Sequence, residues 1–275
     1  MSVSTADKRL AFRRLHEAGC FVIPNPWDIG SARLLAHTGF KALASTSAGY
    51  AWTQGLRDGA TPLDDMLGHL KDLSAAVDIP VNADFEAGYA GDIKSLEINV
   101  VRCAATGVSG LSIEDFTDDP AAPLLAFDEA VARIAAARKA LEQSANGGER
   151  VFLTARSEGF IRGRPDLDET IRRLKAFAEA GADCLYAPGI KTAAEITAVV
   201  KAVAPKPVNL LIGPTGLSVA EAAALGVRRL SIGGALARAA WGEASRVAKE
   251  IMDAGSFAGL SRGASTADIE KTLKP

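Results

Sequence analysis

Apolar residues recur along the chain in short continuous runs, and most runs follow a segment of helical periodicity that ends in glycine. A glycine just after a helix adopts the left-handed conformation that ends it, so each such glycine predicts a helix-to-strand junction. This order of features forms a weak internal repeat. Its five copies are AGCFVI (18–23), TGFKALAS (38–45), TGVSGLSI (106–113), AGADCLYA (180–187) and LGVRRLSI (225–232).

Further apolar runs bring the number of predicted strands to eight. The runs are continuous rather than alternating, which is typical of parallel strands buried on both faces. The predicted strands are Cys20–Ile23, Ala42–Thr46, Val81–Phe85, Gly110–Glu114, Val151–Ser157, Cys184–Ala187, Val208–Leu211 and Arg229–Ile232.

Helical signals fill the gaps between these strands. Thr192–Glu195 and Ser218–Glu221 have the S/T-x-x-E pattern of a capping box. The pattern also predicts an extra helix before Gly19 and an eighth barrel helix from about Ala235 to Ala254, with a polar, weakly patterned tail after it.

Eight alternating β and α units favour an α/β fold, a single (β/α)8 barrel of the TIM type. We assign residues 1–255 to the barrel and residues 256–275 to the tail. An open doubly wound sheet is the alternative, but no G-x-G-x-x-G follows the first strand to support a dinucleotide site.

Composition narrows the class of protein. The chain has 275 residues, of which 48% are hydrophobic, and a net charge of −2, so neither disorder nor a basic nucleic-acid-binding surface is expected. No run approaches the length of a membrane span and the N-terminus lacks a signal-type apolar segment, so we expect a cytoplasmic protein. Cys20, Cys103 and Cys184 lie far apart and are interpreted as buried small hydrophobic residues in a reducing compartment.

Polar residues gather where the predicted strands end, which is where a barrel of this type carries its chemistry. Asp84 and Glu114 end two neighbouring strands, and Arg156 ends the next. Carboxylates packed together repel, so they usually share a cation or a proton. Because only oxygen ligands are offered, Mg²⁺ is favoured, with Mn²⁺ possible as well.

Simpler interpretations remain open for the same residues. Asp84 and Glu114 could cap helices or pair with Arg156, whose planar fork otherwise suits a carboxylate or phosphate. The turn Ser45-Thr46-Ser47 offers hydroxyl and amide donors to an anion, but these residues could also serve only to form the turn.

The chain resembles the isocitrate lyase/phosphoenolpyruvate mutase superfamily over roughly residues 8–255. The resemblance is carried by NPWDIGSARLLAHTGFKALASTSAG, the TQGLRDG stretch, NADFEAGYAGD, SIED, LTARSE and VNLL. It implies a (β/α)8 barrel, a Mg²⁺ ion, and a 2-oxo acid or enolate-like species bound through its oxygens.

The resemblance also implies roles for individual residues. Asp84 matches the second acid of a D-x-D motif and is the expected main metal ligand, with Asn82 at the position of the first acid. Glu114 and Asp58 are expected to hold the metal through water. Ser45, Thr46 and Ser47 match a turn that binds the substrate carboxylate, and Arg156 and Asn209 match further substrate-binding positions.

Three departures from the superfamily pattern limit the choice of reaction. Asn82 removes one negative charge from the metal site. The segment after Glu114, FTDDPAAPLLAF, lacks the K-K-C-G-H loop of isocitrate and methylisocitrate lyases and the lysine of phosphonomutases. Pro188 replaces an acid found at the end of strand six in relatives.

We therefore expect a Mg²⁺-dependent lyase that cleaves a C–C bond of a small 2-oxo or 2-hydroxy (di)carboxylic acid through a metal-stabilised enolate. Arg156, Asp58 and Glu158 are the predicted catalytic residues; Glu158, Tyr50 or a metal-bound water could move the proton. Phosphonomutase or phosphonate-hydrolase chemistry is the alternative, and a non-catalytic 2-oxo-acid binder is a third.

The eighth helix carries a wide apolar stripe, which either covers the barrel wall or meets another subunit. The resemblance implies that this helix is exchanged between subunits, so a homotetramer built as a dimer of dimers is expected, with a dimer next. The stripe comprises Leu236, Ala240, Trp241, Ala244, Val247, Ala248 and Ile251.

Overall fold

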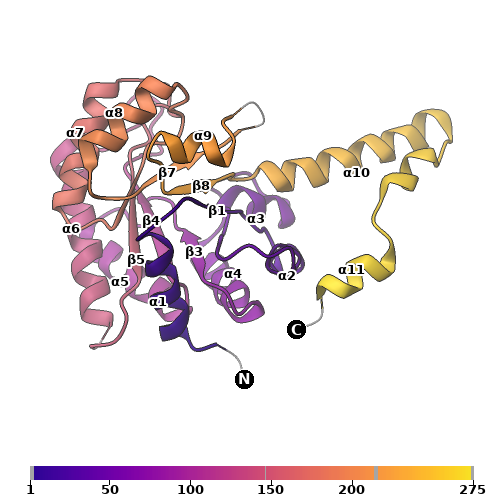
Figure 1. The fold of residues 1–275 in the computed structure, drawn as a ribbon, viewed down its shortest axis with the longest axis horizontal. Helices are drawn as coiled ribbons and strands as arrows, with labels where there is room; N and C mark the ends of the chain where they lie inside the picture. The colour runs from indigo at the N-terminus through magenta and orange to yellow at the C-terminus, as the bar shows by residue number, and fades with distance from the viewer. Residues whose placement is uncertain (1–2, 146, 214–215, 274–275) are drawn as a thin grey trace.

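Eight parallel strands form a nearly closed barrel in the computed structural model, which describes residues 3–145, 147–213 and 216–273 (Figure 1). The strands pair in the order β1-β8-β7-β6-β5-β4-β3-β2. A hydrogen bond from the Ala44 amide to the Pro24 carbonyl oxygen (3.0 Å) bridges the seam between β1 and β2. The predicted (β/α)8 barrel is thus confirmed. The strands are β1 (Phe21–Ile23), β2 (Leu43–Ala44), β3 (Val81–Asp84), β4 (Gly110–Glu114), β5 (Phe152–Arg156), β6 (Cys184–Tyr186), β7 (Val208–Leu211) and β8 (Arg229–Ser231).

Helices surround the barrel and follow local signals in the sequence. Both predicted capping boxes form, with the side chains of Thr192 and Ser218 accepting from the amides of Glu195 and Glu221. The helices are α1 (Thr5–Leu15), α2 (Ile29–His37), α3 (Ser47–Thr53), α4 (Leu63–Ala76), α5 (Ile93–Ala105), α6 (Phe127–Ser144), α7 (Leu167–Glu179), α8 (Ala193–Val203), α9 (Val219–Ala224), α10 (Ala235–Ala254), the 3₁₀ helix η1 (Ala258–Arg262) and α11 (Thr266–Leu273).

Glycines end the helices before the strands, as the repeat predicts. Gly181 and Gly226 have φ values of 105° and 87°, in the region that disfavours other residues. A Cβ on Gly181 would also lie 2.7 Å from the Arg138 side chain, and one on Gly226 would lie 2.8 Å from Val200. Each glycine therefore lets the chain turn while the helix stays packed on the next unit.

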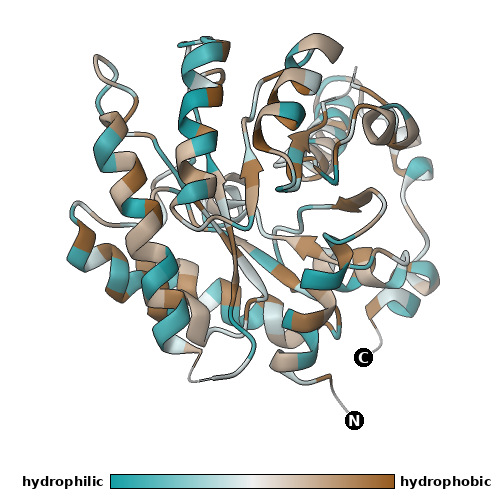
Figure 2. Ribbon diagram, turned by 60° about the vertical axis from the view of Figure 1, so that its left-hand side comes forward, coloured by the Kyte–Doolittle hydropathy of each residue, from teal (hydrophilic) through white to brown (hydrophobic). Residues whose placement is uncertain are grey.

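The main apolar core lies between the strands and the outer helices, and it includes Leu111, Leu153 and Leu185. Figure 2 shows mostly brown strands surrounded by helices in which brown and teal residues mix. The extra N-terminal helix, α1, covers the amino ends of the strands: its Phe12 and the following His16 pack against Phe152 at the start of β5. The opposite end of the barrel is thereby left for the cavity described below.

The C-terminal part of the chain leaves the barrel. Helix α10 has the predicted bounds, but it extends away from the barrel in Figure 1. Only Ala237 and Val247 are buried, whereas Trp241 is 53% exposed, so the apolar stripe does not cover the wall of its own barrel. The polar, weakly patterned tail forms η1 and α11, and α11 packs on α2.

Cys103 and Cys184 are buried as expected, but Cys20 is only half-buried. Within the described ranges, the structure contains no helix with both the length and the apolar character to cross a membrane.

Candidate active site

A cavity of about 470 Å³ lies at the carboxyl ends of the strands. Parallel strands deliver their last residues to one end of a barrel, so side chains distant in sequence meet there. The structure brings every predicted site residue to the wall of this cavity, although their contacts differ from those expected. These residues are Ser45, Thr46, Ser47, Asp58, Asn82, Asp84, Glu114, Arg156, Glu158 and Asn209.

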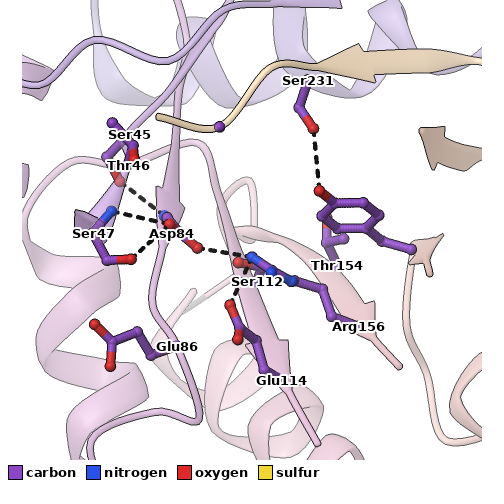
Figure 3. Close-up of polar contacts among 12 residues, drawn as sticks. Ser45, Thr46, Ser47, Asp84, Glu86, Ser112, Glu114, Thr154, Arg156 and Ser231 are labelled. Atoms are coloured by element: carbon purple, nitrogen blue, oxygen red, sulfur yellow. Dashed lines mark hydrogen bonds and ion pairs between the residues drawn. The ribbon is translucent and has the colours of Figure 1, made fainter. Parts of the chain in front are cut away.

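Arg156, the last residue of β5, lies among three carboxylates, of which Figure 3 shows Asp84 and Glu114. Its Nη1 is 3.0 Å from Asp84 Oδ1 and 2.6 Å from Glu114 Oε1, and its Nε donates to Glu158 Oε1 at 2.8 Å. The guanidinium also lies 4.8 Å from the centroid of the Tyr186 ring. Burial acts to lower the pKa of Arg156, but the carboxylates, Glu114 foremost, raise it. The cation is therefore firmly held by residues of the site.

Asp84, at the end of β3, is fixed by the turn that precedes α3. Its amide donates to Ser45 Oγ at 2.8 Å, and Ser47 donates to Asp84 Oδ2 through both its amide and its hydroxyl at 3.0 Å (Figure 3). Thr46 is the N-cap of α3, because its side chain accepts from the Gly49 amide. The turn predicted to bind a substrate carboxylate thus already positions a carboxylate of the protein.

Glu86 is a further acid of the cavity that the sequence reasoning did not select. Its backbone is left-handed (φ 49°), its carbonyl oxygen accepts from the Glu114 amide, and Tyr89 Oη donates to its Oε1 at 3.0 Å. Burial and the nearby Asp84 raise the pKa of Glu86 to about 7. The run D-F-E was the available signal, because it places a second acid directly after a strand end at the mouth of the barrel.

Asp58 lies on a loop at the mouth of the cavity, whereas Asn82 lies within strand β3, deeper in the barrel. Asp58, on the loop between α3 and α4, lies 3.5 Å from Ser47 Oγ, and burial together with Asp84 raises its pKa. Asn82 is buried deeper in β3, where a Cβ on Gly110 would come within 2.5 Å of its Oδ1. Among the described residues, that oxygen has no hydrogen-bond partner. Asn82 therefore lies below the acids rather than among them.

Glu158 is fully buried behind Arg156. Burial raises its pKa although Arg156 acts in the opposite direction. Its amide donates to Asp115 Oδ1 at 2.7 Å, and Asp115 pairs in turn with Arg173 at 3.1 Å. Glu158 Oε2 is buried and has no hydrogen-bond partner in the described part of the chain.

Asn209 forms part of the cavity floor together with residues of β8. Its Oδ1 accepts from Arg229 Nε at 2.8 Å and its Nδ2 donates to Ser231 Oγ at 2.9 Å, which fixes the orientation of the amide. Tyr50, considered above for proton transfer, lies elsewhere. It lines a separate surface hollow and stacks on His69 with ring centroids 3.8 Å apart.

The donor set fits a hard divalent cation by its chemistry. Asp58, Asp84, Glu86 and Glu114 offer only oxygen atoms. Burial, and next to it the charge of Asp84, raise the pKa of Glu86, and a bound cation would offset both effects. In the ranges that the structure describes, no three acidic, histidine or cysteine side chains already stand as a metal site. Arg156 instead bridges Asp84 and Glu114, so metal binding would require these contacts to rearrange.

Comparison with known proteins agrees with this architecture. A family model described as phosphoenolpyruvate phosphomutase matches residues 12–252. A solved structure from Burkholderia cenocepacia J2315, provisionally named a lyase/mutase, is similar at 48% identity and a TM-score of 0.93, over 97% of this chain and 96% of that one.

Two relatives with more specific names are more distant. An oxaloacetate decarboxylase of Paraburkholderia xenovorans (strain LB400) is 26% identical over 234 residues, which is 82% of this chain and 75% of that protein. A phosphonopyruvate hydrolase solved with oxalate and Mg²⁺ is 25% identical with a TM-score of 0.83, over 99% of this chain and 95% of that one. With its barrel, its motifs and a family match over most of its length, the chain belongs to the phosphoenolpyruvate phosphomutase family of the isocitrate lyase/phosphoenolpyruvate mutase superfamily.

Proposed function

We propose that the protein is a Mg²⁺-dependent lyase that cleaves a C–C bond of a small 2-oxo or 2-hydroxy (di)carboxylic acid. The observation that carries this proposal is the cluster of Asp84, Glu86 and Glu114 at the mouth of the barrel, with Arg156 bridging Asp84 and Glu114. The carboxylates outnumber the arginine, so the cluster suits a divalent cation, and that cation would face the negative charge that develops on substrate oxygens. The relative named oxaloacetate decarboxylase supports the same reaction class.

Asp84, Glu86, Glu114 and Asp58 are the residues that would hold Mg²⁺, with Mn²⁺ as the substitute. A bound divalent cation would stabilise an oxyanion formed next to it by several kcal/mol. Glu86 provides the acid that Asn82 lacks, so the departure from the D-x-D pattern does not leave the site short of a carboxylate.

The remaining steps fall to side chains of the chain itself. Cleavage beside a carbonyl leaves the bonding electron pair on an enolate, to which a proton must then be delivered. Arg156, Asn209 and the Ser45–Ser47 turn would orient the substrate carboxylates, with Ser47 exchanging its bond to Asp84 for one to substrate. Glu158 would hold the proton at Oε2, since burial favours its neutral form.

Phosphorus–carbon chemistry is the second candidate, favoured by the phosphonopyruvate hydrolase relative and by the same enolate logic. A non-catalytic 2-oxo-acid binder is the third, favoured by the absence of cysteine, histidine and lysine from the sequence 116–125. A cytoplasmic location remains a prediction.

A substrate screen with Mg²⁺ separates the three. Oxaloacetate, 2-oxoglutarate, 2-methylisocitrate, phosphonopyruvate and phosphoenolpyruvate are each incubated with the protein and followed by ¹H and ³¹P NMR. Cleavage of a carboxylic acid into two products at a C–C bond supports the lyase. A ³¹P shift from phosphonate to phosphate supports the second candidate instead, and binding without turnover of any compound supports the third.

A further inference from the structure

Arg162 is a cation of the cavity wall that the proposed mechanism does not use. It belongs to the loop between β5 and α7, which is anchored by hydrogen bonds from the Arg162 amide to the Glu158 carbonyl oxygen (3.0 Å) and from the Arg164 amide to that of Gly159 (2.8 Å). The side chain lines the catalytic cavity and is exposed to solvent. A charged side chain on an anchored loop at the cavity wall is well placed to meet a ligand that enters the mouth.

The Arg162 guanidinium stacks on Phe116, the residue that follows Glu114 and Asp115. Its carbon Cζ lies 3.9 Å from the centroid of the Phe116 ring, and Phe116 lines the same cavity. A backbone bridge between Phe116 and Leu124 holds the aromatic residue in its segment. Stacking engages one face of the planar guanidinium and leaves its N–H edge free, and that edge matches a carboxylate in a bidentate arrangement.

The charge of Arg162 is not neutralised by a direct partner. It forms an ion pair with no carboxylate in the described part of the chain, whereas Arg156 is engaged by three. Arg162 acts on Asp58 and Glu158 from a distance, lowering the pKa of each against the raising effect of burial. Its charge therefore faces the acids across the cavity.

Two other arginines line the cavity, but their surroundings differ. Arg229 is 3% exposed at the floor, where it already donates to Asn209 and Thr154. Arg238 belongs to α10 and lies near Trp52 at the edge of the wall, as shown by the contacts that a Cβ on Gly234 would make. Arg162 is the one of the three that is stacked and exposed beside the acids.

We propose that Arg162, held flat by Phe116, binds a second carboxylate of the substrate, at the end remote from the reacting carbonyl. The preferred substrates are then dicarboxylic 2-oxo or 2-hydroxy acids rather than monocarboxylic ones. This inference rests on the proposed function, since it assigns the distal half of a substrate whose proximal half meets the Asp84 cluster.

The test compares two ligands that differ only in the distal carboxylate. Malate and lactate are titrated into the protein by calorimetry in the presence of Mg²⁺, and oxalate serves as a probe of the proximal half alone. Wild type should bind malate at least about tenfold more tightly than lactate, the factor expected for a hydrogen-bonded charged group. Arg162→Gln should reduce this preference to within about twofold while leaving the oxalate affinity unchanged.

Matched variants sharpen the result. Arg164→Gln removes a similar charge from the same loop. The Arg164 guanidinium donates to the Ala121 carbonyl oxygen (3.4 Å) and does not line the cavity formed by the described residues, so the preference for malate should persist. Phe116→Leu keeps an apolar residue without the aromatic face, and the preference should fall in part.

Each outcome has a defined meaning. If oxalate binds to wild type but malate has no advantage, or if Arg162→Gln keeps the advantage, the distal site is wrong while the proposed function stands. Loss of the advantage in Arg238→Gln rather than in Arg162→Gln would also overturn it. Failure of wild type to bind oxalate with Mg²⁺ would refute the proposed function itself, and the distal site with it.

Discussion

His16 makes folding of this barrel sensitive to acid. It follows α1, is 8% exposed, and packs against the Phe152 ring with centroids 4.1 Å apart. Its Nδ1 donates to the Phe12 carbonyl oxygen (2.8 Å), which leaves Nε2 to accept from Arg229 (3.2 Å). Burial, together with the positive charge of Arg229, lowers the pKa of His16 to about 3.

The sign and size of the effect follow from the two protonation equilibria. Below the ordinary histidine pKa of about 6.5, the unfolded chain binds a proton at His16 that the folded chain refuses, so stability falls as the pH falls from about 6.5 towards 3. Integrating between pH 7.5 and pH 5 gives a loss of about 2 kcal/mol from this residue alone.

Urea unfolding of wild type and His16→Phe at both pH values isolates the term. The variant keeps an aromatic ring but leaves a buried N–H of Arg229 without its acceptor, so it should be less stable at pH 7.5 by about 1–3 kcal/mol. The difference in unfolding free energy between the two proteins should shrink by about 2 kcal/mol at pH 5, because only wild type loses stability through protonation of His16 in the unfolded chain. The carboxylates and His69 titrate in both proteins, so their contributions to the pH dependence cancel in the difference between the two stabilities. Stability curves that stay parallel would refute the reasoning.

Three further predictions concern the site and the assembly. Asp84→Ala should abolish Mg²⁺-dependent turnover in the NMR screen, whereas Cys184→Ala, buried in the barrel wall, should leave it nearly intact; the reverse pattern contradicts the site. Glu86→Gln should weaken Mg²⁺ binding measured by calorimetry by at least about tenfold, as expected for removing a charged ligand, and Asn82→Ala should weaken it less, because Asn82 lies below the acids. Light scattering should give the mass of a tetramer, or else a dimer; a mass near 28.6 kDa at micromolar concentration would rule out an exchanged α10.

The barrel could be predicted because each β/α unit carries its own local signals. Strands β4 (Gly110–Glu114) and β7 (Val208–Leu211) have the predicted bounds, and the capping boxes at Thr192 and Ser218 both form. These features depend on neighbours within a few residues, which a single sequence displays. The cavity followed with them, since parallel strands necessarily bring their last residues together.

What the sequence did not show depends on contacts between distant segments. Ser47 is predicted to meet a substrate carboxylate, and the sequence did not show that it would also donate to Asp84 on the neighbouring strand. Glu86 enters the cavity only because its backbone turns left-handed after β3. The departure of α10 from the barrel and the docking of α11 on α2 also depend on distant segments. The spacing of apolar residues in a helix is the same whether they pack on the barrel or on another surface, so the sequence could not distinguish the two.

The exposed stripe of α10 also changes what a measured stability would mean. A twenty-residue helix with two buried residues adds little to the folding free energy of one chain. Most of the stabilisation of α10 would therefore come from a surface that packs against its apolar stripe. If that surface belongs to another copy, unfolding and dissociation are one equilibrium, and the midpoint of denaturation rises with protein concentration. Each tenfold dilution would then remove about 1.4 kcal/mol per association step, so stabilities of variants are comparable only at equal concentration.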